Sequence, residues 1–165
     1  MYLEEFYDYK NRLMEDLLTN EEIVRLLDPD TPVDQAASLV YKQVFPYEYL
    51  PETVEYGRTF ICSDVDITSV ENHTVYTARL YVWVFTHRSL LRLPEGGVRV
   101  DKLCSEVAKV LDGSHYYGFG ALDLASVKRF APMTDYQGKV LAFEAKDWHR
   151  TNPTGKEWPV NRKRG

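Results

Sequence analysis

The residues best suited to chemistry stand in one short run near the end of the chain, Glu144-Ala145-Lys146, with Asp123 and Asp135 upstream. An acidic residue followed by Glu-x-Lys is the loose pattern by which metal-dependent nucleases hold a divalent cation and stabilise the attacked phosphate. The same residue types also alternate along ordinary sheet edges, and the surrounding strand patterns offer no positively charged approach for DNA. The sequence therefore favours a structural role for Glu144 and Lys146, with a metal-dependent nuclease as the enzymatic alternative.

Other catalytic and metal-binding patterns are absent from the sequence. The 4 histidines, His73, His87, His115 and His149, show no i,i+4 pair, neighbouring cysteine or Glu-x-x-His arrangement that would indicate a zinc site. No G-x-S-x-G nucleophile motif occurs. The glycines of residues 113–120 follow a predicted helix, whereas a phosphate-binding loop precedes one. We therefore expect no catalytic residues, no metal site and no cofactor, and the protein is predicted not to be an enzyme.

Composition predicts one folded domain that is made in the cytoplasm. The 165 residues are 44% hydrophobic and 27% charged, which is typical of a globular chain that buries a core. The opening MYLEEFYDYK carries acids where a secretory signal carries basic residues, and no apolar run is long enough to predict a membrane span. Cys62 and Cys104 lack metal-ligand spacing, so both are expected to be reduced packing residues, one on a strand and one on a helix.

Charge is unevenly distributed along the chain. The net charge of -5 argues against an adhesive surface for nucleic acid. Residues 1–34 hold ten acids and three bases, whereas residues 146–165 hold six Lys or Arg and two acids. These segments are either solvated faces or opposite ends that meet on neighbouring copies.

The aromatic content is high, with 12 Tyr, 7 Phe and 3 Trp. Tyr and Trp outside periodic segments are enriched at protein interfaces, because they bury a large area with few rotatable bonds. The aromatic residues predicted to lie in loops are Tyr47, Tyr49, Tyr56, Tyr116, Tyr117, Tyr136 and Trp158. They indicate an interaction protein rather than one with a ligand pocket.

The first third of the chain is predicted to be helical. Apolar residues from Leu3 to Leu18 recur at intervals of three, four and seven, which predicts an opening helix. Thr19-Asn20-Glu21-Glu22 has the form of a capping box between Thr19 and Glu22, ahead of a short helix over residues 23–27. Thr31-Pro32 predicts the start of a third helix that ends near Phe45-Pro46.

From Arg58 the period of the apolar residues changes to two, which predicts strands. Residues 58–69 alternate as a half-buried strand, and the longer run 75–87 has two non-polar faces. One face carries Tyr81, Trp83 and Phe85. Because an antiparallel sheet in one domain usually has one wet face, this aromatic face must be covered by a helix of the chain or by a neighbouring subunit.

A helix and two further strands complete the predicted order. The stripe from Val100 to Leu111 predicts a helix, and runs 121–130 and 139–148 predict strands separated by a turn-rich segment, 131–138. This order predicts an α+β fold over residues 1–148, with N-terminal helices, a mostly antiparallel four-stranded sheet and a helix packed on one face. Residues 149–165 lack periodicity and are predicted to form an extended C-terminal arm.

Several phrases of the chain resemble tail-terminator and tail-completion proteins of tailed bacteriophages. They are DLLTNEEIVRLL, VFPYEYLPETVEYGRTFI, TARLYVWVFTH, VDKLCSEVAKVLDG and LASVKRFAPMTDYQGKVLAFEAKDW, within residues 6–148. The resemblance implies an α+β subunit of a ring, expected to be a hexamer, on the head-proximal end of the tail tube. Such a ring ends tube polymerisation and joins the tube protein to the head-completion (neck) proteins. It also implies a location in the virion tail or neck, and in the host cytoplasm during assembly, with no membrane partner.

The residues expected at subunit or partner interfaces come from two regions. They are Tyr81, Trp83 and Phe85 of the aromatic strand face, and Trp158, Arg162, Lys163 and Arg164 of the C-terminal arm. DNA is expected to pass through the lumen of the ring without specific binding, because an acidic wall keeps a passing duplex from sticking. Two alternatives stay open: a head-completion or connector ring protein of the neck, and the metal-dependent nuclease.

Overall fold

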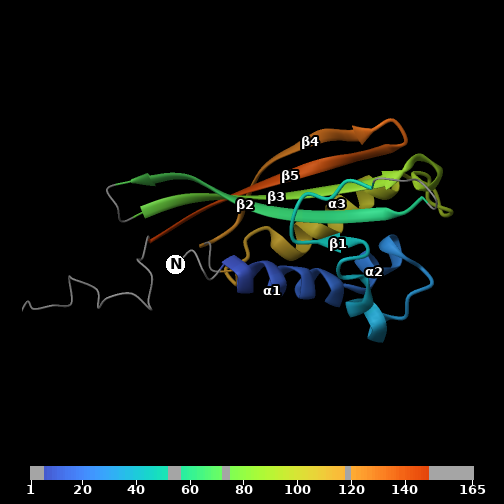
Figure 1. Ribbon diagram of the computed structural model, residues 1–165, viewed down its shortest axis with the longest axis horizontal. Helices are drawn as coiled ribbons and strands as arrows, with labels where there is room; N and C mark the ends of the chain where they lie inside the picture. The colour runs from blue at the N-terminus through green and yellow to red at the C-terminus, as the bar shows by residue number, and fades with distance from the viewer. Residues whose placement is uncertain (1–5, 52–56, 72–74, 118–119, 149–165) are drawn as a thin grey trace, which may run out of the picture.

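Two short helices open the part of the chain that the computed structural model describes, which is residues 6–51, 57–71, 75–117 and 120–148 (Figure 1). Helix α1 spans Phe6–Thr19 and buries the predicted apolar stripe, and α2 spans Glu21–Leu27. The prediction that Thr19 caps α2 is wrong. The side chain of Asn20 caps α2 by accepting from the amides of Glu22 (3.0 Å) and Ile23 (3.1 Å), while the Thr19 hydroxyl donates to the Asp16 carbonyl.

The segment predicted as a third helix changes conformation midway. Val33–Leu39 form a 3-10 helix, η2, and Val44–Phe45 form a short strand, β1. β1 pairs in parallel with the first long strand at Ile61 and Cys62. Pairing with the sheet therefore overrides the local helical pattern of this segment, and the predicted helix end near Phe45-Pro46 is wrong.

Four long strands and β1 make one five-stranded sheet of order β1-β2-β3-β5-β4. The long strands are β2 (Thr59–Glu71), β3 (Val75–His87), β4 (Asp123–Met133) and β5 (Tyr136–Trp148), and all their pairings are antiparallel. The predicted α+β fold with a mostly antiparallel sheet is confirmed, with β1 added to the four expected strands. The predicted loop 131–138 is mostly strand, because β4 and β5 leave only residues 134–135 between them.

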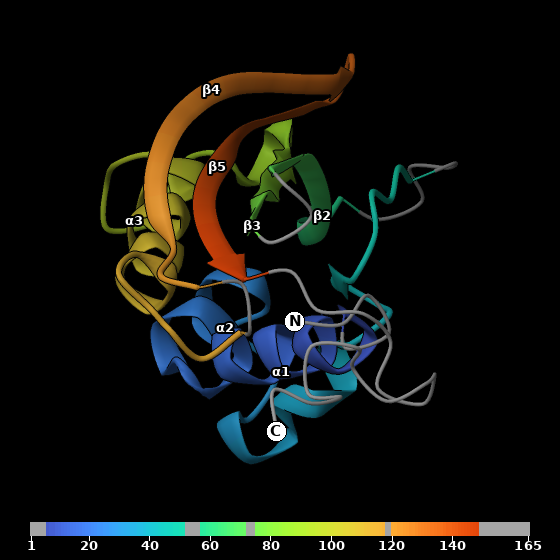
Figure 2. The ribbon, with the colours of Figure 1, turned by 90° about the vertical axis from the view of Figure 1, so that its left-hand side faces the viewer.

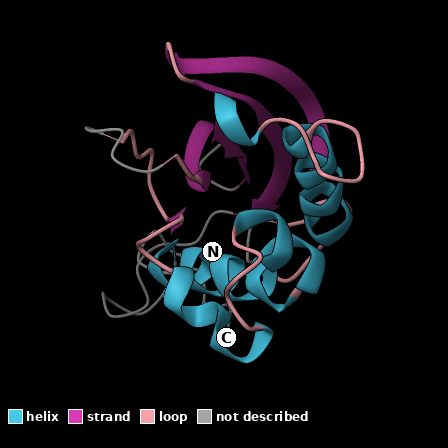
Figure 3. Ribbon diagram, turned by 90° about the vertical axis from the view of Figure 1, so that its right-hand side faces the viewer, coloured by secondary structure: helices cyan, strands magenta, loops and turns pink. Residues whose placement is uncertain are grey.

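A third α-helix connects the two hairpins across one face of the sheet. Helix α3 spans Arg99–Leu111, as its apolar stripe predicts, and a 3-10 turn, η3 (Arg88–Leu90), precedes it. It lies between β3 and β4 in the chain, and those two strands run parallel with β5 between them. Figures 2 and 3 show a strongly curved sheet with α1, α2 and α3 gathered on one side of it.

The main hydrophobic core fills the space between the helices and this face. It includes Leu17 of α1, Leu103 of α3, Leu80 and Val82 of β3, and Phe143 of β5. Within the described part of the chain, no helix is long and apolar enough to cross a membrane. Cys62 and Cys104 are buried and unpaired, on β2 and α3 as predicted.

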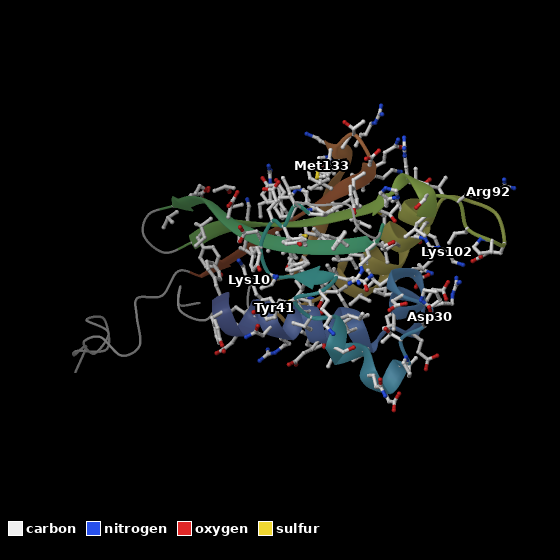
Figure 4. All side chains as sticks on the ribbon, turned by 45° about the vertical axis from the view of Figure 1, so that its right-hand side comes forward. Lys10, Asp30, Tyr41, Arg92, Lys102 and Met133 are labelled. Carbon is white, nitrogen blue, oxygen red and sulfur yellow. The ribbon has the colours of Figure 1, made fainter. Side chains whose placement is uncertain are left out.

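A second, smaller cluster lies on the opposite face of the sheet, at the end where β4 turns into β5. Its buried members are Phe45, Phe60, Cys62, Phe85 and Tyr136. Figure 4 labels Met133, which packs against this cluster on the side of the sheet away from α1. The first half of β2 is therefore buried on both faces, whereas the sequence predicts a half-buried strand.

Candidate functional site

The residues of the predicted acidic pattern meet on two neighbouring strands. Asp123 of β4 is the register partner of Glu144 of β5. Together with Lys146 they line a depression of about 430 Å³ on the sheet. Asp135 lies elsewhere, in the β4–β5 turn, where it pairs with Arg88 at 3.3 Å. The structure thus brings Asp123, Glu144 and Lys146 together and leaves Asp135 out.

Glu144 already has a cationic partner, since Arg79 of β3 donates a hydrogen bond to it and forms an ion pair. This hydrogen bond raises the pKa of Arg79 above its ordinary value. Among the residues described, no group of three or more His, Cys, Asp and Glu side chains is placed to hold a metal ion. The arrangement is a charged surface in which a guanidinium partly neutralises the carboxylates.

This surface extends as a row across all four long strands. Asp66 of β2 is opposite Arg79, Arg79 is opposite Glu144, and Glu144 is opposite Asp123. Side chains in register on adjacent strands share one face of the sheet, and this face is the one opposite the helices. The row holds three carboxylates and one guanidinium, so it is net negative. We call it the acidic row.

The aromatic face of β3 lies next to the acidic row and is only partly covered. Phe85 is 1% exposed beneath the chain's own rings, with Phe60 at 5.3 Å and Phe130 at 5.8 Å between ring centroids. Tyr81 and Trp83 stack on each other at 5.7 Å and stay partly exposed. The chain itself covers Phe85, which leaves Tyr81 and Trp83 as the part accessible to another protein. Their role at an interface stays a prediction.

The loop tyrosines divide into core and surface residues. Tyr117 and Tyr136 are buried, so their predicted role as surface contacts is wrong, whereas Tyr47 and Tyr116 are exposed. The hydroxyl of Tyr117 donates to Asp16 at 2.8 Å and ties the chain after α3 to α1. The predicted contacts Trp158, Arg162, Lys163 and Arg164 lie outside the described residues, as does Tyr56.

The exposed edge strand β4 is a feature that the sequence analysis missed. β4 is the last strand of the sheet, and its Leu124 and Val127 are 36% and 47% exposed. Lys128 and Arg129 follow, both exposed and without an ion-pair partner among the described side chains. Two adjacent basic residues inside a predicted strand are typical of an edge, because charged side chains discourage random edge pairing. That signal was present in the sequence.

The two cysteines offer no reactive site. Burial raises the pKa of both thiols to about 12, so the thiolate is scarce at neutral pH. Cys62 lies in the outer aromatic cluster and Cys104 in the main core. Both therefore act as packing residues.

Comparison with known proteins gives one family. The YomW family model matches residues 20–145, which runs from the cap of α2 to the last part of β5. No curated protein matches the chain.

Proposed function

The chain belongs to the YomW family, and because this family is phage-derived, we propose that the protein is a structural component of a tailed-phage particle. In this proposal it forms a ring at the head-proximal end of the tail tube. The ring ends tube polymerisation and joins the tail to the head. It contacts the tube protein on one side and a neck protein on the other, and it carries no catalytic residue or cofactor.

The observation that carries the ring proposal is the presence of two different open edges on one sheet. Among the strands that the structure describes, β4 forms one edge, and at the other edge β1 covers β2 only at Ile61 and Cys62. Two unlike complementary patches on opposite sides of a subunit make head-to-tail contacts, which generate a closed ring when the rotation closes. An edge that pairs only with itself would give a dimer instead.

The acidic row supports the second part of the proposal, that DNA passes through the ring without binding. A net negative wall repels the phosphates of a duplex and keeps it mobile. Asp66, Glu144 and Asp123 lie on the face without helices, so a ring with its helices outside turns them toward the lumen.

The test is a phage that lacks this protein, examined by negative-stain electron microscopy. A tail terminator predicts tubes that grow far beyond the normal tail length, together with heads that carry no tail. A labelled copy restored to such a phage is expected at the junction of head and tail. Tails of normal length beside unjoined heads would contradict this role and support the alternative, a head-completion or connector ring of the neck.

The nuclease is retained as a second candidate because Asp123, Glu144 and Lys146 line one depression. We expect the purified protein not to cut DNA in magnesium, since Glu144 forms an ion pair with Arg79 and the net negative acidic row repels DNA. A Glu144→Ala variant then behaves like the wild type. Magnesium-dependent cleavage that Glu144→Ala abolishes, while Asp135→Ala leaves it unchanged, would overturn the structural role.

A further inference from the structure

The outer edge of β4 carries no further strand in the described part of the chain, and at its start the Leu124 amide donates to the Asp112 side chain at 2.8 Å. No other described strand pairs with β4 beyond β5, and the main helix contacts with the sheet fall on β2, β3 and β5. Leu124 and Val127 point to the helix side, because their register partners are the core residues Phe143 and Leu141. Lys128 points to the opposite side with Val140. A long edge with exposed apolar side chains is a template for another strand.

The edge of β2 beyond β1 has the complementary character. It starts at Ser63, since β1 stops at Cys62, and it runs to Glu71. Ile67 and Val70 lie on the helix side, opposite Ala78 and Tyr76, and Val70 is 47% exposed. Asp66 lies on the other side, is exposed, and forms no ion pair among the described residues, since its neighbour across the strands, Arg79, pairs with Glu144. This edge is apolar on one face and acidic on the other.

The strand directions fit a head-to-tail contact between these two edges. Each neighbouring pair of long strands is antiparallel, so β2 and β4 of one chain run in opposite directions. Rotation about an axis along the strands preserves these directions. β4 of one copy therefore meets β2 of the next in antiparallel orientation, with the helices of both copies on the same side.

The position of β1 sets the register of this contact. Across the sheet, Lys128 is opposite Val140, which is opposite Trp83. Trp83 is in turn opposite Cys62, whose outer edge already pairs with β1. A stagger of about four residues moves Lys128 onto the free edge, opposite Asp66 of the next copy. The same stagger places Val127 opposite Ile67. It also places Leu124 opposite Val70, because the extra residue of β2 between Ile67 and Ser69 and that of β4 between Leu124 and Ser126 offset each other.

This stagger also matches the geometry of closed sheets. Each copy shifts the register by about four residues of about 3.3 Å each, and its four long strands are spaced about 4.8 Å apart. The ratio of this shift to the width of the four strands corresponds to a strand tilt of roughly 35° to the ring axis. Closed barrels have tilts of about 35–45°.

We propose that β4 of one copy pairs antiparallel with residues 64–70 of β2 in the next copy, through Lys128 with Asp66, Val127 with Ile67, and Leu124 with Val70. This inference rests on the proposed ring. The sheets of all copies then form one continuous barrel, with the helices outside and the acidic row on the inner wall. The partner at this surface is a second copy of the same chain.

Cysteine cross-linking tests the register. In an Asp66→Cys/Lys128→Cys variant the two thiols lie opposite each other on neighbouring copies, within the Cα separation that a disulfide requires. Mild oxidation of assembled protein is expected to give a ladder of covalent oligomers that ends at the closed ring. The matched control, Asp66→Cys/Asp123→Cys, shares one substitution with the test pair and has its second thiol on the same face of β4 but in the unstaggered row. It is expected to give no ladder, and the native cysteines are buried.

Charge reversal tests the contact without new covalent bonds. Lys128→Glu and Asp66→Lys each place like charges opposite each other, so ring assembly is expected to require on the order of tenfold more protein. The double variant Asp66→Lys/Lys128→Glu restores opposite charges at every contact and is expected to assemble within about threefold of the wild type. Arg92→Glu is the control for Lys128→Glu, because Arg92 lies on an exposed loop away from both edges (Figure 4).

The outcomes separate this inference from the ring proposal. Rings that assemble normally but give no ladder with Asp66→Cys/Lys128→Cys, or a double variant that is no better than the singles, overturn the edge pairing and leave the ring standing. A ladder from the Asp66→Cys/Asp123→Cys control instead of the test pair overturns the stagger. A protein that forms no ring, in a phage whose tails keep their length without it, overturns both.

Discussion

Glu22 joins α2 to α3 through two cationic partners. Its carboxylate accepts hydrogen bonds from Arg25 at 2.7 and 3.0 Å, and Lys102 pairs with it at 2.9 Å. Arg25 also reaches Glu95 in the loop before α3 at 3.0 Å. These hydrogen bonds, that of Arg25 first and that of Lys102 second, lower the pKa of Glu22 from 4.5 to about 2.

Glu22→Gln is expected to lower the free energy of unfolding at pH 7 by about 0.5–1 kcal/mol, as is usual for a partly exposed ion-pair network. Because the folded pKa lies below the unfolded one, the contribution of Glu22 is complete above pH 4.5 and is lost as the pH falls through about 2. Urea unfolding between pH 7 and pH 2 measures it. Glu21→Gln, on the same turn, is the control, and a difference that stays constant down to pH 2 would contradict this account.

Trp83 supports the outer aromatic cluster while part of its ring stays exposed. It packs against that cluster and stacks on Tyr81. Trp83→Ala is expected to destabilise the chain by less than the about 3–5 kcal/mol of a fully buried Trp, and more than Tyr47→Ala, whose ring is exposed. Thermal unfolding of the isolated protein measures this loss. An unchanged melting temperature would show that the ring contributes nothing to packing.

The N-cap of α2 shows how far a local structure can be predicted from residue types alone. Thr19 and Asn20 are adjacent, and both residue types cap helices well. The capping-box pattern predicts Thr19, but α1 continues through Thr19, whose hydroxyl donates to the Asp16 carbonyl. Only Asn20 then has the extended backbone that a cap needs. The existence of the cap was predictable, whereas its residue depended on where α1 ends.

At the scale of elements, strong periodicity predicted boundaries and mixed signals did not. β3 has the predicted bounds, because every second residue from Tyr76 to Val84 is apolar and buried, and no turn residue interrupts the run. The predicted loop 131–138 failed because Pro132 and Gly138 are turn residues in most contexts. Here Pro132 lies on an edge strand, where a missing amide breaks no ladder.

Position 138 of β5 is a glycine because β3 leaves no room for a side chain there. A Cβ at this position would collide with the carbonyl oxygen of Val84 and lie 2.6 Å from the Cα of Phe85. Gly138→Ala is therefore expected to push β5 away from β3 and to cost about 1–3 kcal/mol or more. Chemical denaturation measures the loss, with the exposed neighbour Gln137→Ala as the control. Equal stabilities of the two variants would mean that the strands separate at no cost.

At the scale of the whole molecule, the candidate surfaces depend on a strand order that local patterns do not contain. The sequence predicted two hairpins, but it did not indicate that β5 would insert between β3 and β4. That order places β4 at an edge and aligns Asp66, Arg79, Glu144 and Asp123 in one row. Of these four, only Glu144 and Asp123 belong to the pattern found in the sequence, because Asp66 and Arg79 come from the distant β2–β3 hairpin.

The last prediction concerns residues 149–165, which follow β5 and lie outside the described residues. Their bases Arg162, Lys163 and Arg164 complement the acidic first third of the chain, and Trp158 is an apolar anchor of the kind that dominates protein interfaces. Deletion of residues 150–165 is expected to leave the melting temperature of the isolated protein unchanged and to weaken ring assembly or docking.

Salt separates the two contributions of this segment. Screening weakens exposed ion pairs in the wild type, so the difference in assembly between wild type and deletion should be largest at low salt and smaller at 1 M, where the Debye length is about 3 Å. Trp158→Ala alone should reproduce the loss of assembly that remains at high salt. Replacement of the three bases with alanine should reproduce the part of the loss that is seen only at low salt. Native mass spectrometry across a salt series measures each. Equal assembly of wild type and deletion at every salt concentration would contradict a contact through this segment, and the edges of the sheet would then suffice to close the ring.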